Sequence, residues 1–142
     1  MNRLTLTTLA GLALTFTACG QFETSTAYSV NLTGGTSTVA LGTGQANLTL
    51  KGHILTVLGT FNNLTSAATS AHLYGPGATE SSANVSLGLT IDQVTNGARS
   101  GRISGTFTLT DQQIEWLNNR QMYLDLHAGT TRISGVVERL VQ

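Results

Sequence analysis

Residues 44–62 read GQANLTLKGHILTVLGTFN, and the pattern of this stretch decides the predicted fold. Ala46, Leu48 and Leu50 alternate with polar residues, which is the period of a β-strand with one buried face. Gly52 ends this run, and a second alternating run follows it. The stretch as a whole therefore predicts a β-hairpin.

Similar short runs fill the rest of the chain, with turn signals at residues 75–77, 96–97 and 128–129. The further predicted strands are residues 28–32, 36–41, 69–74, 84–91, 102–110, 122–127 and 132–140. Thr110 and Gln113 form a capping box, which predicts one short helix after it. Seven to nine short strands with one short helix predict an all-β fold, either an antiparallel β-sandwich or a Greek-key barrel.

Composition narrows the classes of function. The chain has 142 residues, with 24 Thr, 11 Ser and 16 Gly, which fits one compact, strand-rich domain. Seven Lys and Arg balance seven Asp and Glu, so nothing in the charge attracts a nucleic acid. Gly42-Thr43-Gly44 lacks the lysine and the strand-to-helix context of a phosphate loop, so no nucleotide is expected.

The amino terminus has the features of an export signal. Arg3 is followed by an uncharged, apolar and Thr-rich run over residues 4–18, too short to span a bilayer as a helix. Residues 16–19, FTAC, resemble a bacterial lipobox, in which the cysteine carries lipid. We therefore expect a signal peptide over residues 1–18, lipidation of Cys19, a tether over residues 19–25 and a domain over residues 26–142.

The signal peptide and the lipidated cysteine together predict a protein that is held by its lipid on the extracytoplasmic side of the bacterial cell envelope. The membrane would then be one partner, through the lipid chains. The alternative is an ordinary signal peptide cut near Ala18, which leaves Cys19 as a free thiol. Either alternative places the domain outside the cytoplasm.

Several predicted strands carry polar side chains on one face. In residues 122–127, Tyr123, Asp125 and His127 share the face opposite the apolar residues. In residues 69–74, His72 and Tyr74 share a face in the same way. The outer surface of the domain is therefore expected to carry imidazoles with polar companions.

Three blocks of sequence resemble the CHRD domain, the module repeated in chordin and found singly in bacterial secreted proteins. They are LTVLGTFNNL at residues 55–64, AHLYGPG at residues 71–77 and YLDLHAGTTRISGVV at residues 123–137. Tyr74 stands where the family has a second His, and Asp125 where it has Asn. The resemblance implies a β-sandwich with a binding or structural role in the envelope, with other envelope proteins as partners.

A looser similarity, at the level of motifs, is to copper–zinc superoxide dismutases, which hold copper with imidazoles from neighbouring strands. It gives an alternative function, a copper-dependent superoxide dismutase-like enzyme with copper as its cofactor. The candidate metal ligands are the three histidines of the chain, His53, His72 and His127.

The copper alternative also assigns roles to the neighbours of these histidines. Asp125 and Tyr74 would not bind the metal themselves but would orient the histidine ligands. Arg132 would attract a small anion such as superoxide. The competing interpretation is a structural polar cluster in which His72 and His127 bond to Tyr74 and Asp125 across a sheet face. The sequence leaves both interpretations open.

Overall fold

The structure is a computed structural model that describes residues 24–36, 39–95 and 99–141. The predicted signal peptide, Cys19 and most of the tether lie outside the described residues, as does the predicted turn at 96–97. The elements are β1 (Ser25–Thr36), β2 (Val39–Lys51), β3 (Ile54–Asn62), β4 (Ser70–Gly75), the 3-10 helix η1 (Glu80–Ser82), β5 (Val85–Thr95), β6 (Ser100–Thr108), α1 (Asp111–Asn118), β7 (Tyr123–Ala128), β8 (Thr131–Val136) and β9 (Glu138–Arg139).

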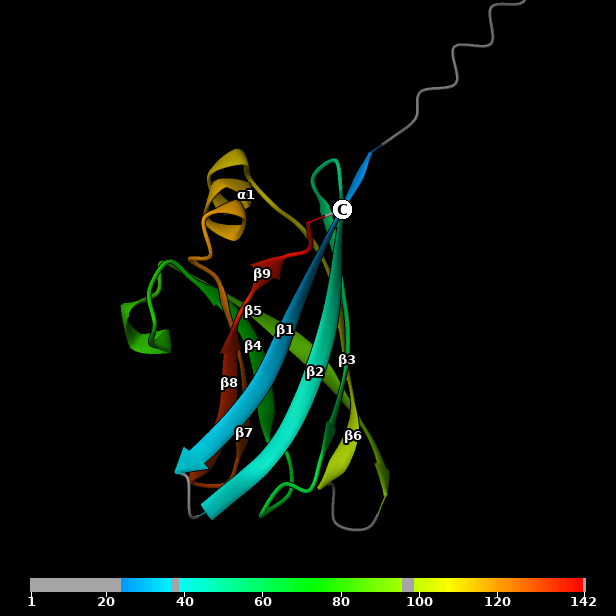
Figure 1. Cartoon of the computed structure of the whole chain (residues 1–142), viewed down its shortest axis with the longest axis vertical. Helices are drawn as coiled ribbons and strands as arrows, with labels where there is room; N and C mark the ends of the chain where they lie inside the picture. The colour runs from blue at the N-terminus through cyan, green and yellow to red at the C-terminus, as the bar shows by residue number, and fades with distance from the viewer. Residues whose placement is uncertain (1–23, 37–38, 96–98, 142) are drawn as a thin grey trace, which may run out of the picture.

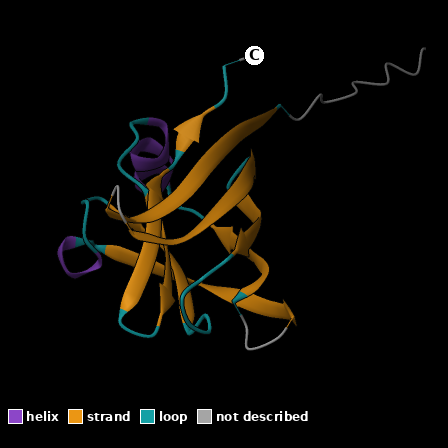
Figure 2. Ribbon diagram, turned by 60° about the horizontal axis from the view of Figure 1, so that its bottom comes forward, coloured by secondary structure: helices purple, strands orange, loops and turns teal. Residues whose placement is uncertain are grey.

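The strands form one antiparallel sheet that closes on itself. Their order is β2-β3-β6-β5-β4-β7-β8-β1, and β1 also pairs with β2, which completes a ring of eight strands. The short β9 adds to β1 outside this ring. Figures 1 and 2 show the resulting barrel. The predicted all-β, antiparallel fold with a short helix is confirmed, and the closed ring fits the barrel alternative but gives the sandwich no support.

The hairpin predicted over residues 44–62 consists of β2 and β3. They pair continuously from Thr43 opposite Asn62 to Lys51 opposite Ile54. The predicted inner residues of β2 are buried and the intervening residues are exposed. β2 is longer than expected, because it begins at Val39 and includes residues 39–41 of the separate strand predicted over residues 36–41. His53 lies in the turn between the two strands.

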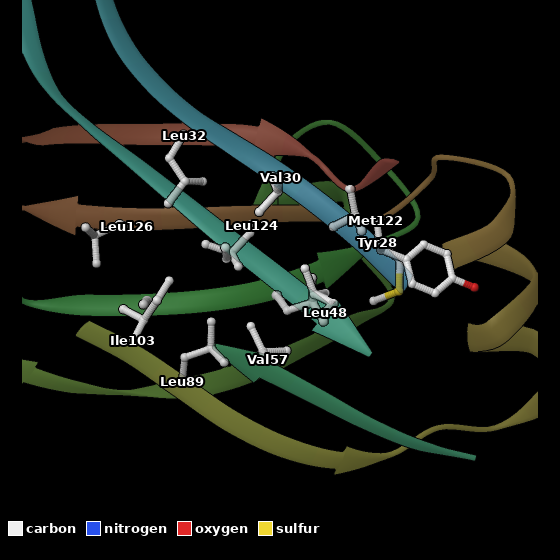
Figure 3. Packing of buried hydrophobic residues seen from close by; sticks show 14 of the residues in the cluster. Tyr28, Val30, Leu32, Leu48, Val57, Leu89, Ile103, Met122, Leu124 and Leu126 are labelled. Atoms are coloured by element: carbon white, nitrogen blue, oxygen red, sulfur yellow. The ribbon is translucent and has the colours of Figure 1, made fainter. Parts of the chain in front are cut away.

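Inward-facing side chains from the whole ring fill the barrel (Figure 3). Most of these side chains are aliphatic, and Tyr28 and Phe61 are the fully buried aromatic members of the cluster. Fully buried examples from six strands are Leu32, Leu48, Val57, Leu73, Ile103, Leu124 and Leu126. Since successive side chains of a strand point to opposite faces, the polar residues between these apolar ones lie on the outer face of the barrel.

The long connection from β6 to β7 crosses one end of the barrel and carries α1 (Figure 1). β4, β5 and β6 follow as neighbours, and β7 returns beside β4, which is a Greek-key arrangement. The helix begins with the predicted capping box, in which Thr110 and Gln113 cap one another's backbone N–H groups. It is anchored by the buried Leu117 and by Tyr28 Oη, which donates to Asn118 Oδ1 at 2.7 Å.

The last predicted strand, residues 132–140, is two strands. β8 pairs with β7 as far as Val136, opposite Tyr123, where β7 begins. Val137 N then donates to Met122 O at 2.9 Å, and the chain crosses to pair with β1 as β9. The predicted strand is divided because β7 pairs with it only as far as Val136. The backbone groups of the residues that follow pair with β1 instead.

Two glycines permit the ring to close between β1 and β8. A Cβ at Gly135 would lie 2.1 Å from the carbonyl oxygen of Asn31 in β1. A Cβ at Gly34 would lie 2.3 Å from the carbonyl oxygen of Arg132 in β8. Neither strand tolerates a side chain at these positions, so the two backbones approach closely only because both residues are glycine.

Candidate functional site

The predicted polar faces of β4, β7 and β8 lie side by side on the outside of the barrel. His72 of β4 is directly opposite Asp125 of β7, and His127 of β7 is directly opposite Arg132 of β8. Directly opposite and diagonal side chains on one sheet face are within contact distance. The register between these strands therefore gathers two imidazoles, a carboxylate and a guanidinium into one cluster.

Asp125 is the centre of this cluster and has an exposed fraction of 0%. Arg132 Nη1 donates to Asp125 Oδ2 at 3.2 Å, and the side chain of Arg132 is 47% exposed. His127 Nε2 lies 4.0 Å from the same carboxylate oxygen. A buried carboxylate is costly without a partner, so the guanidinium stabilises the charge of Asp125.

Glu80, in the 3-10 helix η1, covers the two imidazoles. Its Oε1 lies 3.5 Å from His72 Nδ1, and its Oε2 lies 3.6 Å from His127 Nε2. A single carboxylate therefore bridges histidines of adjacent strands. Three buried side-chain atoms have no hydrogen-bond partner among the described residues, namely His72 Nδ1, His127 Nε2 and Asp125 Oδ1. Such buried polar atoms without a partner can bind a small polar ligand or a water molecule.

Tyr74 forms the other wall of the cluster and is 1% exposed. Its ring stacks on Tyr123, with 5.8 Å between ring centroids and 19° between planes. Its hydroxyl donates to the carbonyl oxygen of Ala78 at 3.3 Å. Burial, and next the repulsion of the phenolate by the nearby Asp125 carboxylate, together raise the pKa of Tyr74 to about 12.

His53 is not part of this cluster. Its Nδ1 lies 2.8 Å from the carbonyl oxygen of Leu109, and its Nε2 lies 3.6 Å from Asp111 Oδ1, beside the start of α1. The structure therefore brings together His72 and His127 through Glu80, and it places His53 among other contacts. In the part of the chain that the structure describes, no group of three or more His, Cys, Asp or Glu side chains has the geometry of a metal site.

Comparison with known families identifies the domain. A family model for the CHRD domain matches residues 20–133, most of the chain and nearly all of the barrel. The chain belongs to the CHRD domain family. Separate comparisons with curated proteins and with solved structures found no match, so the looser similarity to superoxide dismutases gains no support from them.

The cluster lies within two of the three blocks that carry the CHRD resemblance, residues 71–77 and 123–137. The two departures named above, Tyr74 and Asp125, both point into it. Glu80 lies outside those blocks and was missed by the sequence argument. No periodicity marks a residue of a short loop helix, and only its proximity to the turn at 75–77 could have suggested a position over β4.

A second feature of this CHRD domain is an open groove on the outside of β2, β3, β6 and β5. Its volume is about 490 Å³. Gln45, Thr60, Arg102 and Asp92 follow one another across the four strands in register and line it. The remaining lining residues are Asn47, Leu58, Gly59, Ile103 and Ser104. Alternation within a single strand does not mark these residues as a group, because they come together only when the four strands pair.

No helix in the described part of this CHRD domain is both long enough and apolar enough to cross a membrane. The helix α1 has eight residues and one buried side chain, Leu117. Its role in the described structure is to close one end of the barrel.

Proposed function

We propose that this protein is an exported, lipid-anchored CHRD module that acts by binding other components of the bacterial cell envelope. The observation that carries the proposal is the family match over residues 20–133, which begins one residue after Cys19. The lipid-modified cysteine would then be the first residue of the mature chain and directly precede the domain. The lipid would hold the module on the extracytoplasmic side of a membrane.

A binding role is supported by the outer surface of the barrel. The groove across β2, β3, β6 and β5 presents two carboxamides, a guanidinium and a carboxylate beside the 61% exposed Leu58. This combination offers donors, acceptors and an apolar contact within one surface, as interfaces with other macromolecules do. We propose this groove as the surface that contacts another envelope component.

The anchor is tested by replacing Cys19 with Ser in the full chain. We expect the wild-type protein in the membrane fraction, released by detergent, and the Cys19→Ser protein in the soluble extracytoplasmic fraction. Thr24→Ser, a change of similar size five residues later, is the control and leaves the protein in the membrane fraction. An unchanged membrane association of Cys19→Ser contradicts the anchor.

The binding surface is tested with a photo-crosslinking residue in place of Thr60, which lines the groove, in intact cells. The matched position is Thr49, which is also exposed on the outer face of β2 but does not line the groove. We expect a discrete adduct at position 60 that Arg102→Ala abolishes and that position 49 does not give. Equal adducts from both positions contradict the proposal.

A further inference from the structure

One end of the barrel is defined by where β1 begins. Ser25 is paired with Lys51 at the end of β2, and Lys51 with Ile54 at the start of β3. On its other side, β1 is joined to the tail after β9, because Leu140 N donates to the carbonyl oxygen of Ala27 at 2.9 Å. Figure 1 shows α1 and the tail at the same end. We call this surface the β1-start end.

Exposed apolar side chains gather at the β1-start end. In the described residues, four large hydrophobic side chains are exposed: Ile54 (43%), Leu58 (61%), Leu140 (46%) and Val141 (97%). All but Leu58 lie at this end. A groove of about 350 Å³ between the start of β1 and the tail is lined by residues 25–27 and 139–141. Grouped apolar side chains on a surface mark an interaction site.

The chain before β1 limits what can cover this end. Ser25 is six positions after Cys19 in the sequence, and a fully extended chain spans at most about 3.6 Å per position. A lipid on Cys19 would therefore hold Ser25 within roughly 22 Å of the bilayer surface. Ser25, the first residue of β1, lines one groove with Leu140 and Val141, so a lipid on Cys19 would hold this end of the barrel near the bilayer.

We infer that the β1-start end faces the lipid bilayer and that Ile54, Leu140 and Val141 contact its interfacial region. This inference rests on the lipid anchor of the proposed function and adds an orientation to it. The charges at this end are balanced, with Lys51, Arg120 and Arg139 against Asp111, Glu115 and Glu138. Apolar contact is therefore the main attraction, and it does not require anionic lipids.

This orientation also has a consequence for the two polar surfaces. The candidate site and the groove lie on the side walls of the barrel, between its two ends. With the β1-start end against the membrane, both walls stand perpendicular to the bilayer and remain accessible. The loop end that carries residues 63–69 and 128–131 points away from the membrane.

The test uses the lipid-anchored full chain in phosphatidylcholine vesicles that contain a nitroxide lipid quencher near the headgroups. A fluorophore is attached to a single introduced cysteine, Ile54→Cys, Val141→Cys or Asn62→Cys, because a lipidated Cys19 leaves no other thiol. Ile54 and Asn62 are matched positions, both exposed and both outward-facing, at opposite ends of β3. Eight residues of strand separate them by about 26 Å.

We expect several-fold stronger quenching at positions 54 and 141 than at position 62, with little change on adding salt. Replacing Leu140 and Val141 with Ser should lower the quenching at position 54. Vesicle flotation reports the anchor separately. Flotation with equal quenching at 54 and 62 overturns the orientation alone, and failure to float overturns the anchor and the orientation together.

Discussion

Asp125 and Arg132 form an ion pair in which only one partner is accessible to water. Arg132 Nη1 is 3.2 Å from Asp125 Oδ2, the Asp125 side chain is completely buried, and the Arg132 side chain is 47% exposed. Arg132 therefore acts as a polar cover over a charge on the outer face of the barrel. The pair also links β7 to β8, and β8 in turn pairs with β1 where the ring closes.

Replacing Arg132 with Met leaves the buried Asp125 charge without its hydrogen-bonded cation. We expect the free energy of unfolding to fall by about 2–3 kcal/mol, near the lower end for buried pairs because Arg132 is itself half exposed. Denaturant unfolding at neutral pH measures this loss. Combining Arg132→Met with Asp125→Leu should recover part of it.

The matched control for this change is Arg120→Met, which breaks the exposed pair between Arg120 and Glu138. Exposed pairs contribute little, so we expect a loss below about 1 kcal/mol. Equal losses for the Arg120 and Arg132 variants would show that the burial of Asp125 has no energetic consequence.

Because the pKa of Tyr74 is raised in the folded protein, we expect a loss of stability at alkaline pH. Its pKa is raised in the folded state to about 12 from an ordinary 10.0, so the folded protein holds the phenolic proton more tightly than the unfolded chain does. The associated stability is complete below pH 10 and is lost as the pH rises to 12. A difference of this size corresponds to roughly 2–3 kcal/mol.

The measurement is the unfolding free energy of wild type and Tyr74→Phe at several values between pH 9 and pH 12. Burial also raises the pKa of Tyr28, so both proteins lose some stability in this range. We expect the Tyr74→Phe protein to lose less. Parallel curves for the two proteins would contradict the assignment of this titration to Tyr74.

We expect a single added methyl group to lower the stability strongly where β1 and β8 pack closely. Gly135→Ala places a Cβ 2.1 Å from the carbonyl oxygen of Asn31, so the two strands must separate. We expect a loss of about 1–3 kcal/mol. Thermal and denaturant unfolding measure it.

Gly88 gives the control for this prediction. A Cβ there meets its nearest neighbour, His72 Cδ2, only at 3.9 Å, which is ordinary van der Waals contact. Gly88→Ala should change the unfolding free energy by less than about 0.5 kcal/mol. A Gly135→Ala protein as stable as the Gly88→Ala protein would mean that β1 and β8 do not approach one another closely at Gly135.

The copper hypothesis stays a prediction, and the structure divides its three histidines. If copper(II) binds as the sequence argument proposes, His72→Ala and His127→Ala should each lower the bound copper measured by elemental analysis. Glu80→Gln should also lower it, because Glu80 contacts both imidazoles. His53→Ala should leave it unchanged, because His53 contacts Leu109 and Asp111 instead.

The wild-type result decides whether this comparison is meaningful. A folded wild-type protein that retains no copper after incubation and desalting removes the copper hypothesis and its superoxide dismutase-like enzyme. Copper loss on His53→Ala equal to that on His72→Ala would instead support the three-histidine set of the sequence argument.

Local alternation determined the strands of this protein. The inner residues of β2, β3 and β7 follow from the two-residue period alone, since neighbouring side chains of a strand point to opposite faces. The capping box at Thr110 placed the start of α1, because its two hydrogen bonds join residues three apart in the sequence. The polar outer face of His72, Asp125 and His127 was predicted in the same way.

Pairing between distant segments was decided only by the tertiary structure. The closed ring depends on β1 meeting β8, and the position where β7 begins decides where β8 stops and β9 begins. Glu80 joins His72 and His127 across a loop, and Arg132 seals Asp125 from water, while His53 is held apart by its contacts at Leu109 and Asp111. Periodicity reports which face a residue occupies, but register and loop path report which residues it meets, and these are fixed by packing over the whole barrel.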